Sequence, residues 1–191
     1  MPITINGNGT VTGISAGGLP SGSLTLAASD MPTGSVIQVV EHKLTTQHTT
    51  ASGDQWHYST LTGAITTQFA NSKVLVDQCL NISGQGTGQF TISGKLYRND
   101  AEITDANSTV TSSRPNSWWS VGSQGWDNYD RYNVCATYLD TPGSAATFTY
   151  KIYVRDYRDN GELNINRGSY DSDNDNCPVG KSTLTLTEIR G

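Results

Sequence analysis

The sequence is poor in charged residues. Asp, Glu, Lys and Arg make up only 15% of the 191 residues, against roughly 25% in an average soluble domain. Neutral Thr, Ser, Asn, Gln and Gly must therefore form most of the surface. Because Ser, Thr and Asn offer the backbone competing hydrogen bonds and Thr is stiff at χ1, this composition disfavours helices. It suits strands joined by tight turns.

Long apolar runs and clusters of basic residues are also missing. No apolar segment approaches the roughly 18 to 20 residues that span a bilayer. The net charge is -5, and without a run of Lys and Arg the chain has no basic surface for phosphates. We therefore expect neither membrane insertion nor a nucleic-acid partner.

Cysteine is scarce as well. Cys79, Cys135 and Cys177 are odd in number and lack metal-ligand spacing, which predicts reduced thiols, dispensable for the fold, in a protein made in a cytoplasm. The start of the chain has neither the basic nor the apolar part of a secretory signal. A surface-like composition without an export signal favours a virion protein, which is assembled in the host cytoplasm and reaches the exterior by lysis.

What the sequence does contain is a period-two alternation of apolar and polar residues from Val36 onward. Such alternation is typical of half-buried antiparallel strands, and Gly, Pro and Asn turns separate the segments. We predict an all-β fold of about eight strands, an antiparallel β-sandwich resembling a jelly roll. The clearest strands are expected at residues 36–40, 74–82, 90–96, 132–138, 148–154 and 184–186. Residues 36–40 are apolar on both faces, which fits a central strand, and 104–130 are expected to form a long loop.

Residues 1–35 differ from the rest and are predicted to be an N-terminal attachment arm, followed by the β-sandwich domain over residues 36–191. The arm has hairpin-like Asn-Gly turns but too few apolar residues to fold alone. We expect it to order against a partner; a floppy leader is the alternative. The aliphatic residues expected to dock on the virion are Ile3, Ile5, Val11, Ile14 and Leu19.

No group of residues has the pattern of a metal or catalytic site. The histidines do not converge as zinc ligands would and are expected on the surface or on edge strands: His42, His48 and His57. A second group resembles the opening of a calcium loop: Asp171, Asp173 and Asp175. Asn176 stands where such a loop needs Gly and Ser182 where it needs Glu, so a solvated loop is favoured and a cation site is the alternative. With no nucleophile elbow or phosphate-binding loop, we expect no enzyme, cofactor or metal.

Aromatic residues gather in the expected loop over residues 104–130. A polar, Gly-containing stretch there holds three of the four tryptophans and a tyrosine: Trp118, Trp119, Trp126 and Tyr129. Aromatic side chains on a loop can stack on sugar rings or anchor an interface. The alternative is that they plug one end of the sandwich or pack around an oligomer axis.

The opening Ile3-Thr-Ile-Asn-Gly-Asn-Gly-Thr-Val-Thr-Gly resembles the leader of virion fibre and appendage proteins of marine bacteriophages, cyanophages especially. Later motifs resemble the β-domain that follows in such proteins: Ser35-Val-Ile-Gln-Val-Val, Ser72-Lys-Val-Leu-Val, Lys95-Leu-Tyr-Arg-Asn, Tyr138-Leu-Asp-Thr-Pro-Gly, Tyr150-Lys-Ile-Tyr-Val-Arg, Asn164-Ile-Asn-Arg and Ser182-Thr-Leu-Thr-Leu-Thr-Glu-Ile.

This resemblance implies a non-enzymatic virion component, a homotrimer that docks on other virion proteins through the leader and projects the β-domain outward. The leader meets the domain without a repetitive shaft, which favours a capsid decoration protein, a knob or a short head or tail fibre. The alternative is the tip of a tail fibre that binds a receptor, with a host cell-surface glycan as candidate partner.

Overall fold

The computed structural model describes residues 27–50, 54–84, 89–109, 113–124, 131–157, 162–175 and 177–191. The chain divides into two compact units, Met1–Met31 and Pro32–Gly191. The described part of the first unit contains a short 3-10 helix, η1 (Ala28–Asp30). The five aliphatic residues predicted to dock on the virion lie outside the described residues: Ile3, Ile5, Val11, Ile14 and Leu19.

The second unit is a β-sandwich of two antiparallel sheets, as predicted. Sheet A contains β1 (Val36–Leu44), β11 (Ser182–Ile189), β4 (Lys73–Gly84) and β8 (Tyr132–Asp140), with the short strands β10 (Leu163–Ile165) and β2 (His48–Thr49). Sheet B contains β3 (His57–Thr66), β9 (Thr147–Asp156), β5 (Gln89–Arg98) and β7 (Trp119–Gln124), with the short β6 (Ala101–Glu102). The only helix in the described part of this unit is the 3-10 turn η2 (Thr104–Ala106).

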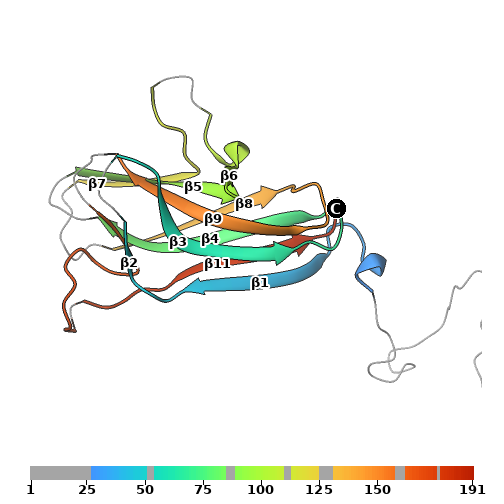
Figure 1. The fold of residues 1–191 in the computed structure, drawn as a ribbon, viewed down its shortest axis with the longest axis horizontal. Coiled ribbons are helices and arrows are strands. Elements are labelled where there is room, and N and C mark those ends of the chain that lie inside the picture. Colours follow the sequence, from blue (N-terminus) through green and yellow to red (C-terminus); the bar gives the residue numbers. More distant parts are fainter. Residues whose placement is uncertain are drawn as a thin grey trace, which may run out of the picture. The chain divides into compact units, whose positions relative to one another are not determined.

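The strand order is that of a jelly roll. The long strands run β1-β11-β4-β8 in sheet A and β3-β9-β5-β7 in sheet B. The first long strand therefore pairs with the last, the second with the seventh, the third with the sixth and the fourth with the fifth. This nested pairing is how a double-sheet jelly roll is built, and Figure 1 shows the strands running along one axis in two layers.

The core lies between the two sheets and follows the predicted alternation. In β4 the inward side chains Val74, Val76, Leu80 and Ile82 are completely buried. Burial of each such side chain stabilises the fold by roughly 1.5 to 3 kcal/mol before ordering costs. The other buried members of the core are Leu61, Ile65, Ile92, Leu96, Trp119, Phe148, Tyr150, Ile152, Val154, Leu163, Ile165, Leu184 and Leu186.

Two expectations about the strands are wrong. The segment predicted to be central, β1, is an edge strand whose described pairing is with β11 alone. It is apolar on both faces because a register shift between Val36 and Gln38 breaks the alternation, leaving Val36 and Val39 exposed.

The segment predicted to be one loop contains β7, which pairs with β5. Its Ser and Gly residues hid the strand from a search for alternating apolar residues.

An ion pair between a buried carboxylate and a partly exposed arginine closes one end of the sandwich. Asp140, at the end of β8, is 3% exposed, and Arg98 Nη1 on β5 lies 2.7 and 2.6 Å from its two carboxylate oxygens. The Tyr150 hydroxyl on β9 donates a third hydrogen bond at 2.6 Å. Burial, followed by the bond to Asp140, raises the pKa of Tyr150, so its hydroxyl remains a donor. The cluster ties sheet A to sheet B.

A second buried carboxylate fastens the edge strand. Glu188 on β11 is fully buried. It accepts hydrogen bonds from Gln38 Nε2 at 2.6 Å, Ser72 Oγ at 2.6 Å and the backbone N–H of Gln68 at 2.7 Å. Burial raises the pKa of this carboxyl, but the hydrogen bonds outweigh it and the net pKa is lowered. The charged form therefore holds β1, β11 and the β3–β4 connection together.

Cys79 and Cys135 form a disulfide, so the prediction that all three thiols are reduced is wrong for this pair. The antiparallel register of β4 and β8 places the two residues directly opposite each other, with Cα atoms 4.1 Å apart. Cys177 is free and buried. The odd number of cysteines therefore gives no support to a reducing compartment.

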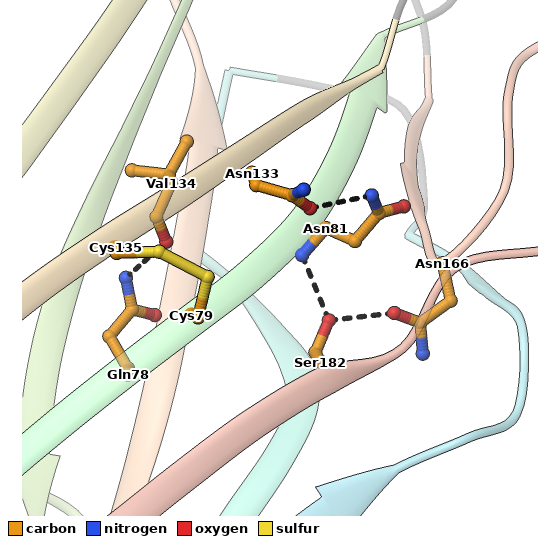
Figure 2. Close-up of a disulfide and its surroundings, with 8 residues drawn as sticks. All are labelled: Gln78, Cys79, Asn81, Asn133, Val134, Cys135, Asn166 and Ser182. Carbon is orange, nitrogen blue, oxygen red and sulfur yellow. Dashed lines mark hydrogen bonds between the residues drawn. A yellow bond between two sulfur atoms is a disulfide. The ribbon is translucent and has the colours of Figure 1, made fainter.

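A chain of polar contacts runs beside the disulfide (Figure 2). Asn81 Nδ2 donates to Asn133 Oδ1 at 2.8 Å, and the backbone N–H of Asn81 donates to Ser182 Oγ at 2.9 Å. Ser182 in turn donates to Asn166 Oδ1 at 2.7 Å. These bonds connect β8, β4, β11 and the residue that follows β10, so sheet A is fixed by side chains as well as by its ladder.

We predict that Asp140→Ala lowers the free energy of unfolding by about 2 to 3 kcal/mol, because it removes the acceptor of the buried Tyr150 hydroxyl and the partner of Arg98, whose side chain is 30% exposed. Asp54→Ala is the matched control, since Asp54 pairs with Arg155 while its own side chain is 47% exposed, and its loss should stay within about 1 kcal/mol. Urea unfolding followed by circular dichroism measures both. Equal losses would show that the Asp140 cluster does not stabilise the sandwich.

We predict that the double variant Cys79→Ser, Cys135→Ser keeps the fold but loses about 2 to 4 kcal/mol of stability. The disulfide closes a loop of sequence separation 56 and so restricts the unfolded chain, while the β4–β8 ladder holds the strands in either case. Urea midpoints with and without reductant give the loss. An unfolded variant would show that the ladder alone cannot hold β8.

Candidate functional site

The outer face of sheet B carries aromatic and basic side chains. On β9 the inward residues Tyr150, Ile152 and Val154 are fully buried. The residues between them alternate to the other side and are half-buried there. With their neighbours on β3 and β5 they form what we call the aromatic face: Trp56, Tyr58, Tyr97, Tyr153 and Tyr157, together with Lys95, Lys151 and Arg155.

Three tyrosines from adjacent strands lie side by side on this face. The ring centroids of Tyr153 on β9 and Tyr97 on β5 are 4.3 Å apart, with an interplanar angle of 36°. On the other side of Tyr153, the ring centroid of Tyr58 on β3 lies 5.7 Å away, with an interplanar angle of 37°. Burial raises the pKa of Tyr97, and nearby Glu102 raises it further, so its phenol stays protonated at neutral pH.

A second aromatic pair continues the face. The rings of Trp56 and Tyr157 meet edge to face, with centroids 6.3 Å apart at 87°. Lys95 Nζ lies over the Trp56 ring at 4.7 Å, and the Arg155 guanidinium lies over the Tyr157 ring at 4.4 Å. Lys95 is directly opposite Tyr153 in the β5–β9 ladder. The pair of Trp56 and Tyr157 therefore joins the three tyrosines in one continuous surface.

Each cation of the aromatic face has a carboxylate partner. Three ion pairs are formed: Lys95 with Glu102 at 2.7 Å, Lys151 with Asp100 at 2.5 Å, and Arg155 with Asp54 at 2.6 Å. The hydrogen bond to Asp100 raises the pKa of Lys151. Three positive charges are thereby matched by three negative charges, and the cations serve mainly to hold the rings in place.

A hollow of about 400 Å³ opens beside the aromatic face. Its lining comes from β5, β7, the segment before β7 and the residue after β9. The residues that line it are Thr91, Ser93, Arg114, Pro115, Ser117, Ser120 and Tyr157. Ser93 Oγ donates to Ser120 Oγ at 3.1 Å, and Ser120 Oγ lies 3.2 Å from the Ile92 carbonyl. Burial raises the pKa of Tyr157, against smaller opposing effects of Arg155 and Ser93.

Of the tryptophans predicted to bind a ligand, the structure describes Trp118 and Trp119, and both pack in or against the core. Trp119 is 8% exposed and belongs to the core, where it lies against Gly94: a Cβ added at Gly94 would come within 2.0 Å of the indole ring. Trp118 is half-buried and packs against the same core. Both indoles therefore contribute to the packing of the core, and ligand binding by these residues stays a prediction. Trp126 and Tyr129 lie outside the described residues.

The residues of the aromatic face were not singled out by the sequence, although a signal exists. The alternation that turns Tyr150, Ile152 and Val154 inward requires the residues between them to share the opposite face. Those residues are aromatic or basic, whereas the outward positions of β4 and β8 carry side chains as different as those of Asp77, Cys135 and Leu139. Only the pairing of β3, β9 and β5 brings the separate aromatic residues together.

The possible metal ligands of the sequence do not converge. Among the described residues, no group of three or more His, Cys, Asp or Glu side chains is placed to hold a metal ion. The histidines lie on β1, β2 and β3, and His42 Nε2 contacts the Ala64 backbone. In the acidic loop, Asp171 pairs with Arg167 at 3.4 Å.

The outer face of sheet A is different in kind. Residues opposite one another in three successive ladders form a line across it: Val39, Thr187, Leu75 and Leu139. Val39 is 59% and Leu139 44% exposed. We call this line the aliphatic row. It is an exposed apolar surface bounded by the open edge of β1, the kind of surface that marks protein contacts.

The sequence matches no protein-family model and no curated protein. Within its described residues, the chain has no helix with the length and apolarity needed to cross a membrane.

Proposed function

We propose that this chain is a structural protein of a bacteriophage particle: a capsid decoration protein, a knob or a short head or tail fibre. The N-terminal arm docks on the particle and the jelly-roll domain projects outward from the virion surface. The protein is assembled in the host cytoplasm, and the proposal assigns it no catalytic activity. It is supported by the resemblance of the leader and of the ordered strand motifs to phage appendage proteins.

The observation that carries the proposal is the division of the chain. The second unit is a complete jelly roll, and every described residue of its core cluster, including the partly buried members, lies at Val40 or later. We assign the docking to the first unit, since the described core of the second is built from residues of that unit. Jelly rolls are common in viral capsids, and a rigid two-layer domain suits a surface component.

The aliphatic row supports assembly with other copies. Val39 and Leu139 are exposed although the core of the same chain is well buried, and a neighbouring subunit would remove both from water. We propose a homotrimer, in which each subunit presents one arm to the particle. Three linked arms bind far more tightly than one, because the second and third attachments are intramolecular.

We predict that deleting residues 1–31 leaves a folded, oligomeric jelly roll that attaches to phage particles at least about 100-fold more weakly. Intact and truncated proteins are mixed with particles that lack them, and the amount that sediments with the particles is compared. Equal attachment would place the docking surface in the β-domain. An unfolded truncated protein would show that residues 1–31 contribute to the core.

We predict that Val39→Lys converts the trimer to monomers without unfolding the domain, because a charge placed in the aliphatic row cannot be buried against a neighbour. Val179→Lys is the matched control, since Val179 is an equally exposed valine outside the row, at 56% against 59%. Sedimentation at micromolar concentration measures the mass. A wild-type mass of one chain, or a trimeric Val39→Lys variant, would contradict the proposed assembly.

A further inference from the structure

We propose that the aromatic face and the hollow beside it form one binding site for a neutral carbohydrate. The inference concerns the outer face of sheet B of the isolated chain and does not depend on the proposed role in a phage particle. Four features carry it: the continuous row of rings, the matched charges, the hydroxyl groups in the lining of the hollow and the volume of the hollow.

The rings supply the surface on which a sugar ring can stack. Tyr58, Tyr153 and Tyr97 come from three adjacent strands, and the Tyr153 ring centroid lies 5.7 Å from that of Tyr58 and 4.3 Å from that of Tyr97. Tyr97 and Tyr153 therefore cover one face of each other, and a sugar can stack only on ring faces turned away from that contact. Tyr side chains combine an apolar ring with a polar end, and a pyranose likewise has an apolar C–H face and a rim of hydroxyls. A row across several strands suits an extended oligosaccharide better than a single compact ligand.

The matched charges decide between a neutral ligand and an anionic one. An anionic polymer binds by replacing its counterions with Lys and Arg side chains. The three cations of the aromatic face, Lys95, Lys151 and Arg155, are already paired with carboxylates. Along the rings a sulfated or uronic-acid polymer would therefore meet three carboxylates for every three cations, so this part of the site favours a ligand without charge; Arg114 is the one further cation, in the lining of the hollow.

The hollow supplies the polar contacts that orient such a ligand. Thr91, Ser93, Ser117 and Ser120 line it. The hydroxyls of Ser93 and Ser120 already donate within the protein and offer a ligand only acceptor positions, whereas those of Thr91 and Ser117 can donate and accept. The Tyr157 ring is a further part of the lining, with its hydroxyl oxygen buried. A volume of about 400 Å³ lies within the range of small-molecule sites, roughly 300 to 1,000 Å³. One end of an oligosaccharide fits the hollow while the rest lies along the rings.

The site is also braced, as a binding surface must be. Arg155 is fixed between Asp54 and the Tyr157 ring, and Lys95 between Glu102 and the Trp56 ring. Rings that are already ordered lose little conformational freedom when a ligand binds. The side chains that would stack on a sugar are therefore positioned before it arrives.

The test uses the full-length protein and two sets of probes. The neutral set is a panel of hexasaccharides of glucose, mannose and galactose; the anionic set is the matching sulfated oligosaccharides. We expect isothermal titration to detect binding to at least one neutral probe. The affinity should change little between 0.05 and 0.5 M salt, although the Debye length falls from about 14 to about 4 Å, because an uncharged ligand displaces no counterions. Binding only to sulfated probes, or to none at millimolar concentration, would overturn the proposal.

The variants locate the site. Tyr153→Ala should weaken binding of the neutral probe about tenfold or more, whereas Tyr153→Phe keeps the ring and should bind within about threefold of wild type. Ser117→Leu, which fills the hollow without adding a ring, should weaken binding as well. Tyr170→Ala is the control, because Tyr170 is an exposed tyrosine that belongs to neither the face nor the lining of the hollow.

Folding and assembly are checked for every variant by circular dichroism and sedimentation. If Tyr153→Ala is folded and binds as wild type does, the aromatic face is not the site. If Tyr153→Ala lowers the oligomeric mass, the face is a subunit contact and the proposal is overturned. If Tyr153→Ala does not fold, Tyr153→Phe and Ser117→Leu decide: the proposal requires retained binding in the first and weakened binding in the second.

Discussion

The structure depends on one constraint: each long strand must turn alternate side chains toward a single core. β4 illustrates it, with Val74, Val76, Leu80 and Ile82 inward and fully buried. Because the side-chain period of a strand is two residues, the burial of one set fixes the direction of the other set. The core therefore determines which residues reach the outer faces, and through them what each face can bind.

The two outer faces that result are chemically different. Sheet B presents five aromatic side chains braced by three ion pairs, whereas sheet A presents a mixture of polar and charged side chains crossed by an aliphatic row. We therefore propose one surface for an oligosaccharide and another for a neighbouring subunit. Neither function requires the core to change, since both use residues that the core leaves outside.

Polar groups inside the sandwich fix how the sheets meet. Asp140 joins β8 to β5 and β9 at one place, and Glu188 joins β1 and β11 to the β3–β4 connection at another. Aliphatic packing alone tolerates small shifts of one sheet over the other, but buried carboxylates with several donors do not. The registers that align the rings of sheet B are therefore held by contacts made elsewhere in the molecule.

The all-β class, the sandwich and most of the long strands follow from the alternation of apolar and polar residues, because alternation is a local property that needs no knowledge of partners. The outward residues of β9 are part of the same alternation, although their meaning was not apparent from it. The neighbours of each strand could be found only in the folded chain: β1 lies at an edge, residues 119–124 pair with β5, and Cys79 faces Cys135. The same holds for the candidate site, since Tyr58, Tyr97 and Tyr153 are far apart in the chain and meet only through the ladders of sheet B. Strand order and register depend on which long-range pairings bury the most apolar surface together, and no single segment of sequence contains that information.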